Sequence, residues 1–157
     1  MPRTYEPIAS TTLGSAANTV TFSDIPGTYT DLRLVAVFTD SNFYTLLRFN
    51  SDSGNNYSRT YLINATSGRN SNVSSAYLDG HNTGLTPNIF DIFSYANTNV
   101  FKTCLNAAAN MGASEVARHV YLWRSTNAIT SVSIISPNNT SSIASGATFS
   151  LYGIKAA

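Results

Sequence analysis

The sequence predicts an all-β protein, a two-sheet β-sandwich of the jelly-roll type, and three observations lead to this prediction. Short apolar segments recur at roughly 8 to 12 residue spacing between Gly, Pro, Asn and Ser, as in β-sandwiches. These segments are rich in Thr, Val, Ile, Tyr and Phe, which pack well on a pleated surface. The segment DLRLVAVFTD is apolar on both faces, which is typical of a strand in the middle of a sheet. Because 157 residues is the size of one domain, we expect residues 1–157 to form a single β-sandwich domain.

The predicted strands follow from these patterns in chain order. Residues 1–12 contain Pro2 and Pro7, and since proline donates no ladder hydrogen bond, we expect an N-terminal arm or edge segment there. The strands expected after it are 17–22, 31–39, 44–49, 57–63, 73–78, 88–95, 128–135 and 147–155. Between the first two of these, IPGT at 25–28 predicts a type II turn, because glycine readily adopts the positive φ that this turn needs.

Two further segments fit either a helix or a strand. FKTCLNAAAN is rich in alanine, and EVARHVYLWR spaces Val116, Val120 and Trp123 as on a helix, but its apolar residues also alternate. We predict strands at 101–110 and 115–124, joined as a hairpin by NMGAS, because the surrounding segments are all predicted strands.

Composition and charge exclude several classes of function. Charged residues make up 11% of the chain and the formal net charge is +1, with the nine Lys and Arg residues scattered, so we expect no nucleic-acid partner. No segment approaches the roughly 18 apolar residues of a membrane span, and MPRTYEPIAS lacks the apolar core of a signal peptide. Neither a membrane partner nor Sec export is expected. The single cysteine, Cys104, is predicted to be a small buried hydrophobic residue.

The segment RFNSDSGNNYSRTY, residues 48–61, resembles a cation-binding loop at first sight. An EF-hand-like loop needs oxygen ligands at its first, third and fifth positions. Counting from Asn50, only Asn50 and Asp52 fit this pattern, and Gly54 takes the fifth position. We therefore predict a hairpin loop in which Gly54 supplies a positive φ, and no metal site, although a ligand at Asp52 is left open.

Other groups with potential chemistry are isolated in the sequence. DGHN at 79–82 holds a carboxylate and an imidazole, His81, but such a cluster is more often an exposed turn. His119 lies in an apolar segment and is predicted to be a core or interface histidine. The two glutamates, Glu6 and Glu115, and the dispersed aspartates offer no pair of carboxylates for acid–base catalysis. We predict no catalytic, cofactor-binding or metal-binding residue and no cofactor, while ligand binding by either histidine stays open.

Three segments carry a resemblance to a known family. TVTFSDIPGTYTDLRLV, RFNSDSGNNYSRTYL and the closing ATFSLYGIKAA together resemble small virion proteins of tailed bacteriophages, notably cyanophages and marine phages. The resemblance spans nearly the whole chain. It implies a jelly-roll protein without catalytic residues, used as a capsid cement or decoration protein or as a module of a tail or fibre.

The function expected from this resemblance is that of a non-enzymatic capsid cement protein. It would stabilise the head by binding the lattice of the major capsid protein, as a homo-oligomer and most simply a trimer, in a virion assembled in the host bacterial cytoplasm. Nine tyrosines among few charges, with edge strands, suit broad adhesive contact. The alternative is a tail-fibre or tail-spike receptor-binding module, in which Tyr, Trp123 and Asn side chains meet a host glycan. A glycan-cleaving enzyme lacks its pair of carboxylates.

Overall fold

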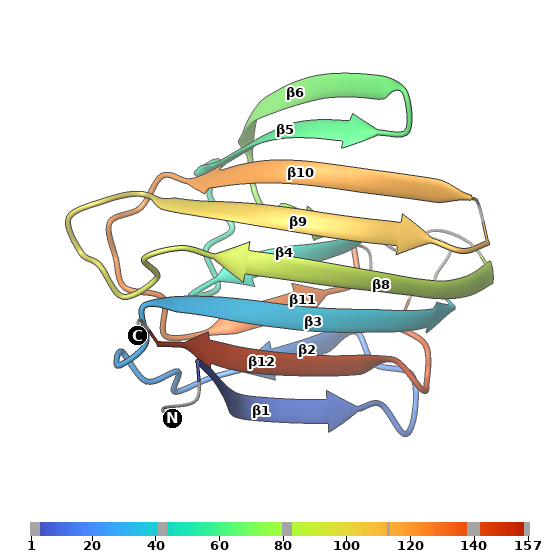
Figure 1. Ribbon diagram of the computed structural model, residues 1–157, viewed down its shortest axis with the longest axis horizontal. Coiled ribbons are helices and arrows are strands. Elements are labelled where there is room, and N and C mark those ends of the chain that lie inside the picture. Colours follow the sequence, from blue (N-terminus) through green and yellow to red (C-terminus); the bar gives the residue numbers. More distant parts are fainter. Residues whose placement is uncertain (1–3, 41–43, 80–82, 113, 138–141, 156–157) are drawn as a thin grey trace.

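A computed structural model describes residues 4–40, 44–79, 83–112, 114–137 and 142–155 of the chain. Within these ranges the protein is all-β and has no helix, and its antiparallel strands form two sheets packed face to face (Figure 1). The predicted β-sandwich is therefore confirmed.

Eight strands form a jelly roll. They are β1 (Tyr5–Thr12), β2 (Thr19–Phe22), β3 (Asp31–Asp40), β4 (Thr45–Phe49), β7 (Ala76–Leu78), β8 (Thr83–Ile92), β11 (Val132–Ile135) and β12 (Thr148–Ile154). One sheet contains the order β1-β12-β3-β8, and the other has the order β2-β11-β4-β7. Consecutive strands of these eight alternate between the sheets, except that β4 and β7 are paired neighbours in the smaller sheet, and this is the jelly-roll topology.

Two hairpins widen only the first of these sheets. The strands β9 (Lys102–Asn110) and β10 (Glu115–Trp123) form one hairpin, and β5 (Tyr57–Ile63) and β6 (Thr66–Val73) form the other. Because β9 pairs with β8 and β10 pairs with β5, the larger sheet continues as β8-β9-β10-β5-β6. The larger sheet has eight strands and the smaller sheet four, so the smaller sheet cannot cover the whole inner face of the larger one. In Figure 1 the strands β2, β11 and β4 lie behind the lower part of the larger sheet.

The core lies between the sheets and is built from alternate residues of their strands. On β3, Leu32, Leu34 and Phe38 are fully buried, and the strand lies between β12 and β8, as its two apolar faces predicted. On β12, Phe149 and Leu151 point inward and are fully buried in the same cluster. Burial of each such side chain contributes about 1.5–3 kcal/mol, so both strands contribute to the stability of the sandwich.

The structure corrects several predicted strands. The hairpin of β9 and β10 is confirmed, but β6 was missed because TSGRNSNV is polar on both sides of an edge strand. The strand predicted at 73–78 is only β7, and β8 begins at Thr83 rather than at residue 88. The strand predicted from residue 128 begins at Val132, because the backbone N–H groups of Thr130 and Ser131 donate to the side chain of Asn50. Residues 5–12 form β1, an edge strand with a bulge between Pro7 and Ala9.

The type II turn predicted at 25–28 is wrong, because Gly27 does not adopt a positive φ. Instead Asp24, with φ of 55°, takes the left-handed conformation. The turn is held from outside by Tyr95, whose hydroxyl donates to the carbonyl of Pro26 and accepts from the backbone N–H of Tyr29 at 3.3 Å. A buried tyrosine from the loop after β8 therefore fixes the path of the chain into β3.

The closing strand carries a glycine whose size matters. Gly153 lies beneath the ring of Tyr29, and a Cβ at this position would lie 2.3 Å from Cγ of that ring. Gly153→Ala should therefore lower the free energy of unfolding by about 1–3 kcal/mol through overpacking, measured by urea denaturation. Gly14→Ala is the matched control, since nothing lies within 4 Å of its Cβ and the change should stay within about 0.5 kcal/mol. Equal stability of Gly153→Ala and the wild type would contradict this account.

Candidate functional site

The loop after β4 is a structural anchor. It is not the predicted hairpin loop, because β4 belongs to the smaller sheet and β5 to the larger one. Its left-handed residues are Asn50 and Ser51, not Gly54. The carboxylate of Asp52 accepts hydrogen bonds from Gly54 N at 2.8 Å, Asn56 Nδ2 at 3.0 Å and Trp123 Nε1 at 2.7 Å. The carboxylate is thus occupied by donors from the protein, and it ties the crossing loop to β10.

The pKa of Asp52 reflects this environment. Partial burial by itself would raise the pKa, but the hydrogen bonds from Trp123, Asn56 and Gly54 outweigh it and lower the pKa below its usual value. Trp123 is 2% exposed, so the expectation that its indole could meet a sugar ring is wrong. The aromatic rings of Phe49 and Tyr57 lie against it, at centroid distances of 5.4 and 6.3 Å.

The other isolated groups of the sequence are also structural. Cys104 is buried as predicted, and burial raises the pKa of its thiol, which keeps it protonated and unreactive. The ammonium group of Lys102 is buried and donates to the carbonyls of Asn97, Val100 and Thr126 at 2.6, 2.8 and 3.3 Å. Burial lowers the pKa of Lys102, and its three carbonyl partners lie in the loops at this end of the larger sheet.

His119 is a core histidine, as predicted, and it belongs to a buried polar cluster. Its Nε2 lies 2.8 Å from Oδ2 of Asp79, which is 4% exposed and not in the exposed turn expected there. The pair is close but not aligned as a hydrogen bond, and neither ring nitrogen of His119 has a hydrogen-bond partner among the described residues. The imidazole lies between the rings of Tyr61 and Tyr121, at centroid distances of 6.1 and 5.6 Å. His81, the other predicted candidate, lies outside the described residues.

Two asparagines complete this cluster, and the sequence analysis missed them. Asn88 binds the backbone of Asp79 in both directions, with its Oδ1 accepting at 3.0 Å and its Nδ2 donating at 2.7 Å. Asn106 donates to Oδ1 of Asn88 at 3.2 Å and lies directly opposite His119 in the ladder of β9 and β10. The position of Asn106 opposite His119 follows from the predicted hairpin. The length of the NMGAS connection could therefore have indicated this pairing. No hydroxyl or thiol of the described residues is hydrogen-bonded to His119.

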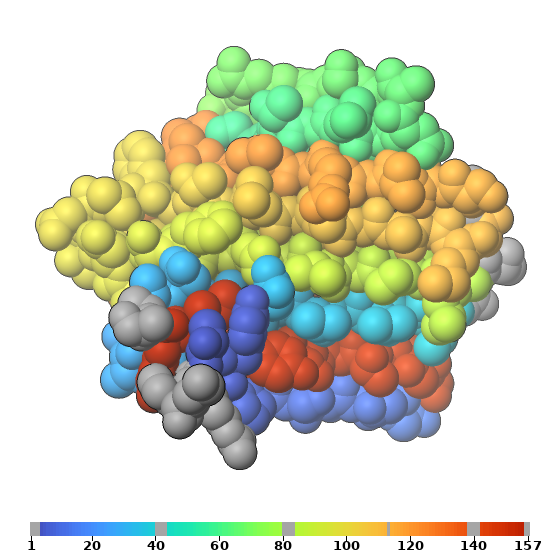
Figure 2. All heavy atoms as spheres, viewed as in Figure 1, coloured from blue at the N-terminus to red at the C-terminus, as the bar shows by residue number. Residues whose placement is uncertain are grey.

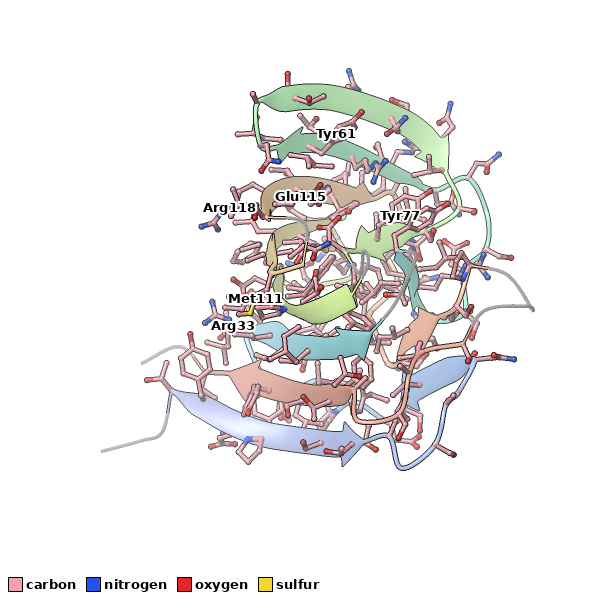
Figure 3. The ribbon with its side chains drawn as sticks, turned by 90° about the vertical axis from the view of Figure 1, so that its right-hand side faces the viewer. Arg33, Tyr61, Tyr77, Met111, Glu115 and Arg118 are labelled. Carbon is pink, nitrogen blue, oxygen red and sulfur yellow. The ribbon has the colours of Figure 1, made fainter. Side chains whose placement is uncertain are left out.

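A small pocket opens beside this cluster, and we call it the Tyr77 pocket. Its lining consists of Tyr44, Arg59, Ile63, Tyr77 and Asp79, and its volume is about 160 Å³. Arg59 lies over the ring of Tyr77 with its guanidinium carbon 4.3 Å from the ring centroid. Figure 3 shows Tyr77, a residue of β7, on the inner side of the larger sheet, where its ring meets Arg59 of β5. The pocket exists here because the smaller sheet ends at β7.

The opposite side of the larger sheet presents an exposed apolar surface, which we call the outer face. Its large apolar side chains are between 42% and 62% exposed, and they are Leu62, Leu85, Ile89, Leu105, Val116 and Val120. Ile89, Ala107, Arg118 and Leu62 are cross-strand neighbours in a row over four strands. Figure 2 looks onto this face, and Figure 3 shows Arg33 and Arg118 projecting from it.

The outer face is hollowed along β9. The hollow has a volume of about 460 Å³, and alanines of β9 form its floor between Ile89 of β8 and Val116 of β10. It exists because Ala107 and Ala109 are shorter than their neighbours on the flanking strands. On the smaller sheet one cross-strand row, Thr21, Ser133 and Arg48, is polar, and the next row, Thr19, Ile135, Leu46 and Tyr77, is mixed.

In comparisons with known proteins, no protein-family model and no curated protein matches the chain. The resemblance to phage virion proteins therefore stays a prediction. In the part of the chain that the structure describes, no group of three or more His, Cys, Asp or Glu side chains is arranged to hold a metal ion. The same residues include no helix long and apolar enough to cross a membrane.

The anchor at Asp52 can be tested through pH. Asp52→Asn should lower the free energy of unfolding by about 1–3 kcal/mol near pH 7, because hydrogen bonds to a charged acceptor are lost. The pKa of Asp52 is lowered in the folded state, so its contribution is present above the unfolded pKa of about 3.9 and disappears as the pH falls through the folded value. The gap between variant and wild type in urea unfolding should therefore narrow below about pH 4.

The matched control is Asp24→Asn. Asp24 is exposed and is bonded by the hydroxyl of its neighbour Ser23. Its replacement should change the free energy of unfolding by no more than about 0.5 kcal/mol. A difference between wild type and Asp52→Asn that stays the same at low pH would show that the charge of Asp52 does not contribute.

Proposed function

We propose that this protein is a non-enzymatic structural protein of a phage virion, a capsid cement or decoration protein that binds the lattice of the major capsid protein. The observation that carries the proposal is the exposed apolar outer face. Large exposed apolar patches on a soluble protein mark interaction sites, because each apolar side chain covered by a partner leaves water. The resemblance of the chain to small phage virion proteins supplies the class of partner.

The hollow in the outer face is suited to receive one apolar side chain of the partner. Ala107 and Ala109 form its floor, and Ile89 and Val116 form its walls. Interfaces gain most of their binding energy where an anchor side chain fills such a hollow at the centre of the contact. The surrounding apolar residues of the outer face would exclude water from this contact.

Charge favours a different protein over a second copy of the chain on this face. Arg118 is exposed at the hollow and forms no ion pair with a described residue. Asp91, an acid of the same face, is already held by Arg33 through two hydrogen bonds of 2.6 and 2.8 Å. A partner with an exposed carboxylate near its apolar anchor would therefore suit the outer face better than the chain itself does.

The rest of the proposal follows the same family resemblance. The protein would form homo-oligomers on the capsid, with a trimer as the expected state, and the exposed edges β1 and β6 offer surfaces for such contacts. Its location would be the virion, after assembly in the host bacterial cytoplasm.

The docking surface can be tested by filling the hollow. Ala107→Trp should weaken binding to capsids from which the protein has been stripped by at least about tenfold, because the indole occupies the space of the partner's side chain. Ala107 is an outward position of β9, so the variant should fold and keep the thermal melting temperature of the wild type within a few degrees. Co-sedimentation with capsids of the virus that encodes the protein measures the binding.

The matched control is Thr19→Trp, which places the same side chain at an exposed strand position of the smaller sheet. This variant should bind like the wild type. Full binding by Ala107→Trp, or loss of binding by Thr19→Trp alone, would place the docking surface elsewhere.

A further inference from the structure

A second hollow lies in the outer face, where the hairpin of β5 and β6 joins β10, and we call it the Arg69 hollow. Its volume is about 280 Å³. In the ladders, Arg69 lies opposite Thr60, which lies opposite Val120 of β10. The residues of this face that surround the hollow are Ser58, Thr60, Arg69, Thr103, Val120 and Leu122. The Arg69 hollow is separate from the hollow along β9, because the two share no lining residue.

The Arg69 hollow is polar and contains no acid. The hydroxyl-bearing residues Ser58, Thr60 and Thr103 belong to it, and its lining includes no Asp or Glu. Arg69 is exposed and forms no ion pair with a described residue. A second guanidinium, that of Arg124, donates to Oγ of Ser58 at 3.1 Å and likewise has no ion pair in the described part of the chain. The hollow therefore combines unbalanced positive charge with hydroxyl donors.

The acid Asp91 of the outer face is too far away to balance this charge. It lies in the same cross-strand row as Arg69, but on β8, and the row crosses β9, β10 and β5 before it reaches β6. Four strand spacings of about 4.8 Å separate the two residues by roughly 19 Å, which exceeds the Debye length of about 8 Å at physiological salt. Asp91 is also held by Arg33. The charge of Arg69 is thus available to a partner.

The distance between the two hollows constrains the partner. Ala107, in the floor of the hollow along β9, and Arg69 are separated by three strand spacings, or about 14 Å. One turn of a helix rises only about 5.4 Å. An apolar side chain and an acid that fill the two hollows at once must therefore lie well apart on the partner, as two points of a broad folded surface.

We propose that the Arg69 hollow binds an acidic side chain of the protein that docks on the outer face, about 14 Å from the apolar side chain that fills the hollow along β9. This inference rests on the proposed function and adds a second feature that the partner must carry. A guanidinium can donate two parallel hydrogen bonds to a carboxylate, and the hydroxyls of Thr60 and Thr103 can donate to the same group. A nucleic acid is a poorer match, because it needs a row of cations, whereas the exposed apolar side chains of Leu62 and Val120 adjoin the hollow.

The experiment is co-sedimentation of the full chain with stripped capsids at about 0.1 M and about 1 M salt. Arg69→Gln should weaken binding by at least about tenfold at the lower salt, because a hydrogen-bonded ion pair with the partner is lost. The gap between this variant and the wild type should shrink at the higher salt, which screens the charges. Thr60→Glu places a carboxylate opposite Arg69 in the ladder and should weaken binding in the same way. Circular dichroism should show that both variants are folded.

The matched control is Lys155→Gln, which removes the same charge from an exposed residue just after β12, a strand far from β6 in the larger sheet. It should bind like the wild type, and equal loss of binding by this variant would show that only net charge matters. Undiminished binding by Arg69→Gln would overturn this inference. The docking surface would still stand if Ala107→Trp binds weakly, and would fall as well if that variant also binds fully. Binding of a short DNA duplex by the wild type but not by Arg69→Gln would also overturn the inference, because the hollow would then be a polyanion site.

Discussion

The unequal width of the two sheets is the constraint on which the rest of the structure depends. A sheet must bury its inner face, and four strands cannot cover eight. Beyond β7 the larger sheet therefore covers itself with its own long side chains. Tyr61, His119 and Tyr121 stack along the inner side of β5 and β10, and Arg59 lies over Tyr61. Both the polar cluster and the Tyr77 pocket are products of this incomplete cover.

The same constraint explains why polar groups lie inside the sandwich. Burial of an unpaired polar group costs free energy, and two of the buried polar side chains are tied to the backbone. Asn88 satisfies the main chain of Asp79, and Lys102 satisfies three loop carbonyls. These contacts fix loops rather than carry out chemistry. The buried polar groups thus hold loops around an apolar core, while the apolar side chains of the outer face remain exposed.

The fold could be predicted from the sequence in those strands whose alternating apolar and polar residues indicate which side chains are buried. The two apolar faces of β3, the alternation of β12 and the hairpin of β9 and β10 each depend on the side chains of the strand itself. The polar strand β6 carries no such pattern, because only its backbone ladder with β5 defines it. The start of β11 depends on a side chain from the loop after β4, since Oδ1 of Asn50 accepts hydrogen bonds from the two backbone N–H groups that precede β11.

The candidate site could be predicted only in part, for the same reason. The hairpin register places Asn106 opposite His119, and this is local information. Asp79 follows β7, a strand of the smaller sheet, and its side chain lies beside His119 and Asn106 of the larger sheet. The spacing of residues along the chain does not predict this contact between the two sheets. The alanines of β9, which form the floor of the hollow in the outer face, are visible in the sequence. The walls of the hollow come from other strands, and the sequence does not show that these strands lie beside β9.

The pairing of β1 with β12 has a consequence for folding during translation. Tyr5 lies opposite Ile154 in that ladder, so β1 finds its neighbour only after β12 has been synthesised. β2 likewise pairs with the much later strand β11, whereas β3 pairs first with β8 and later with β12. Topologies with such distant pairings fold slowly, because long loops must close before contacts form. During translation the chain therefore exposes unpaired edges, and the bulge between Pro7 and Ala9 of β1 is a feature that disfavours pairing of such an edge with another chain.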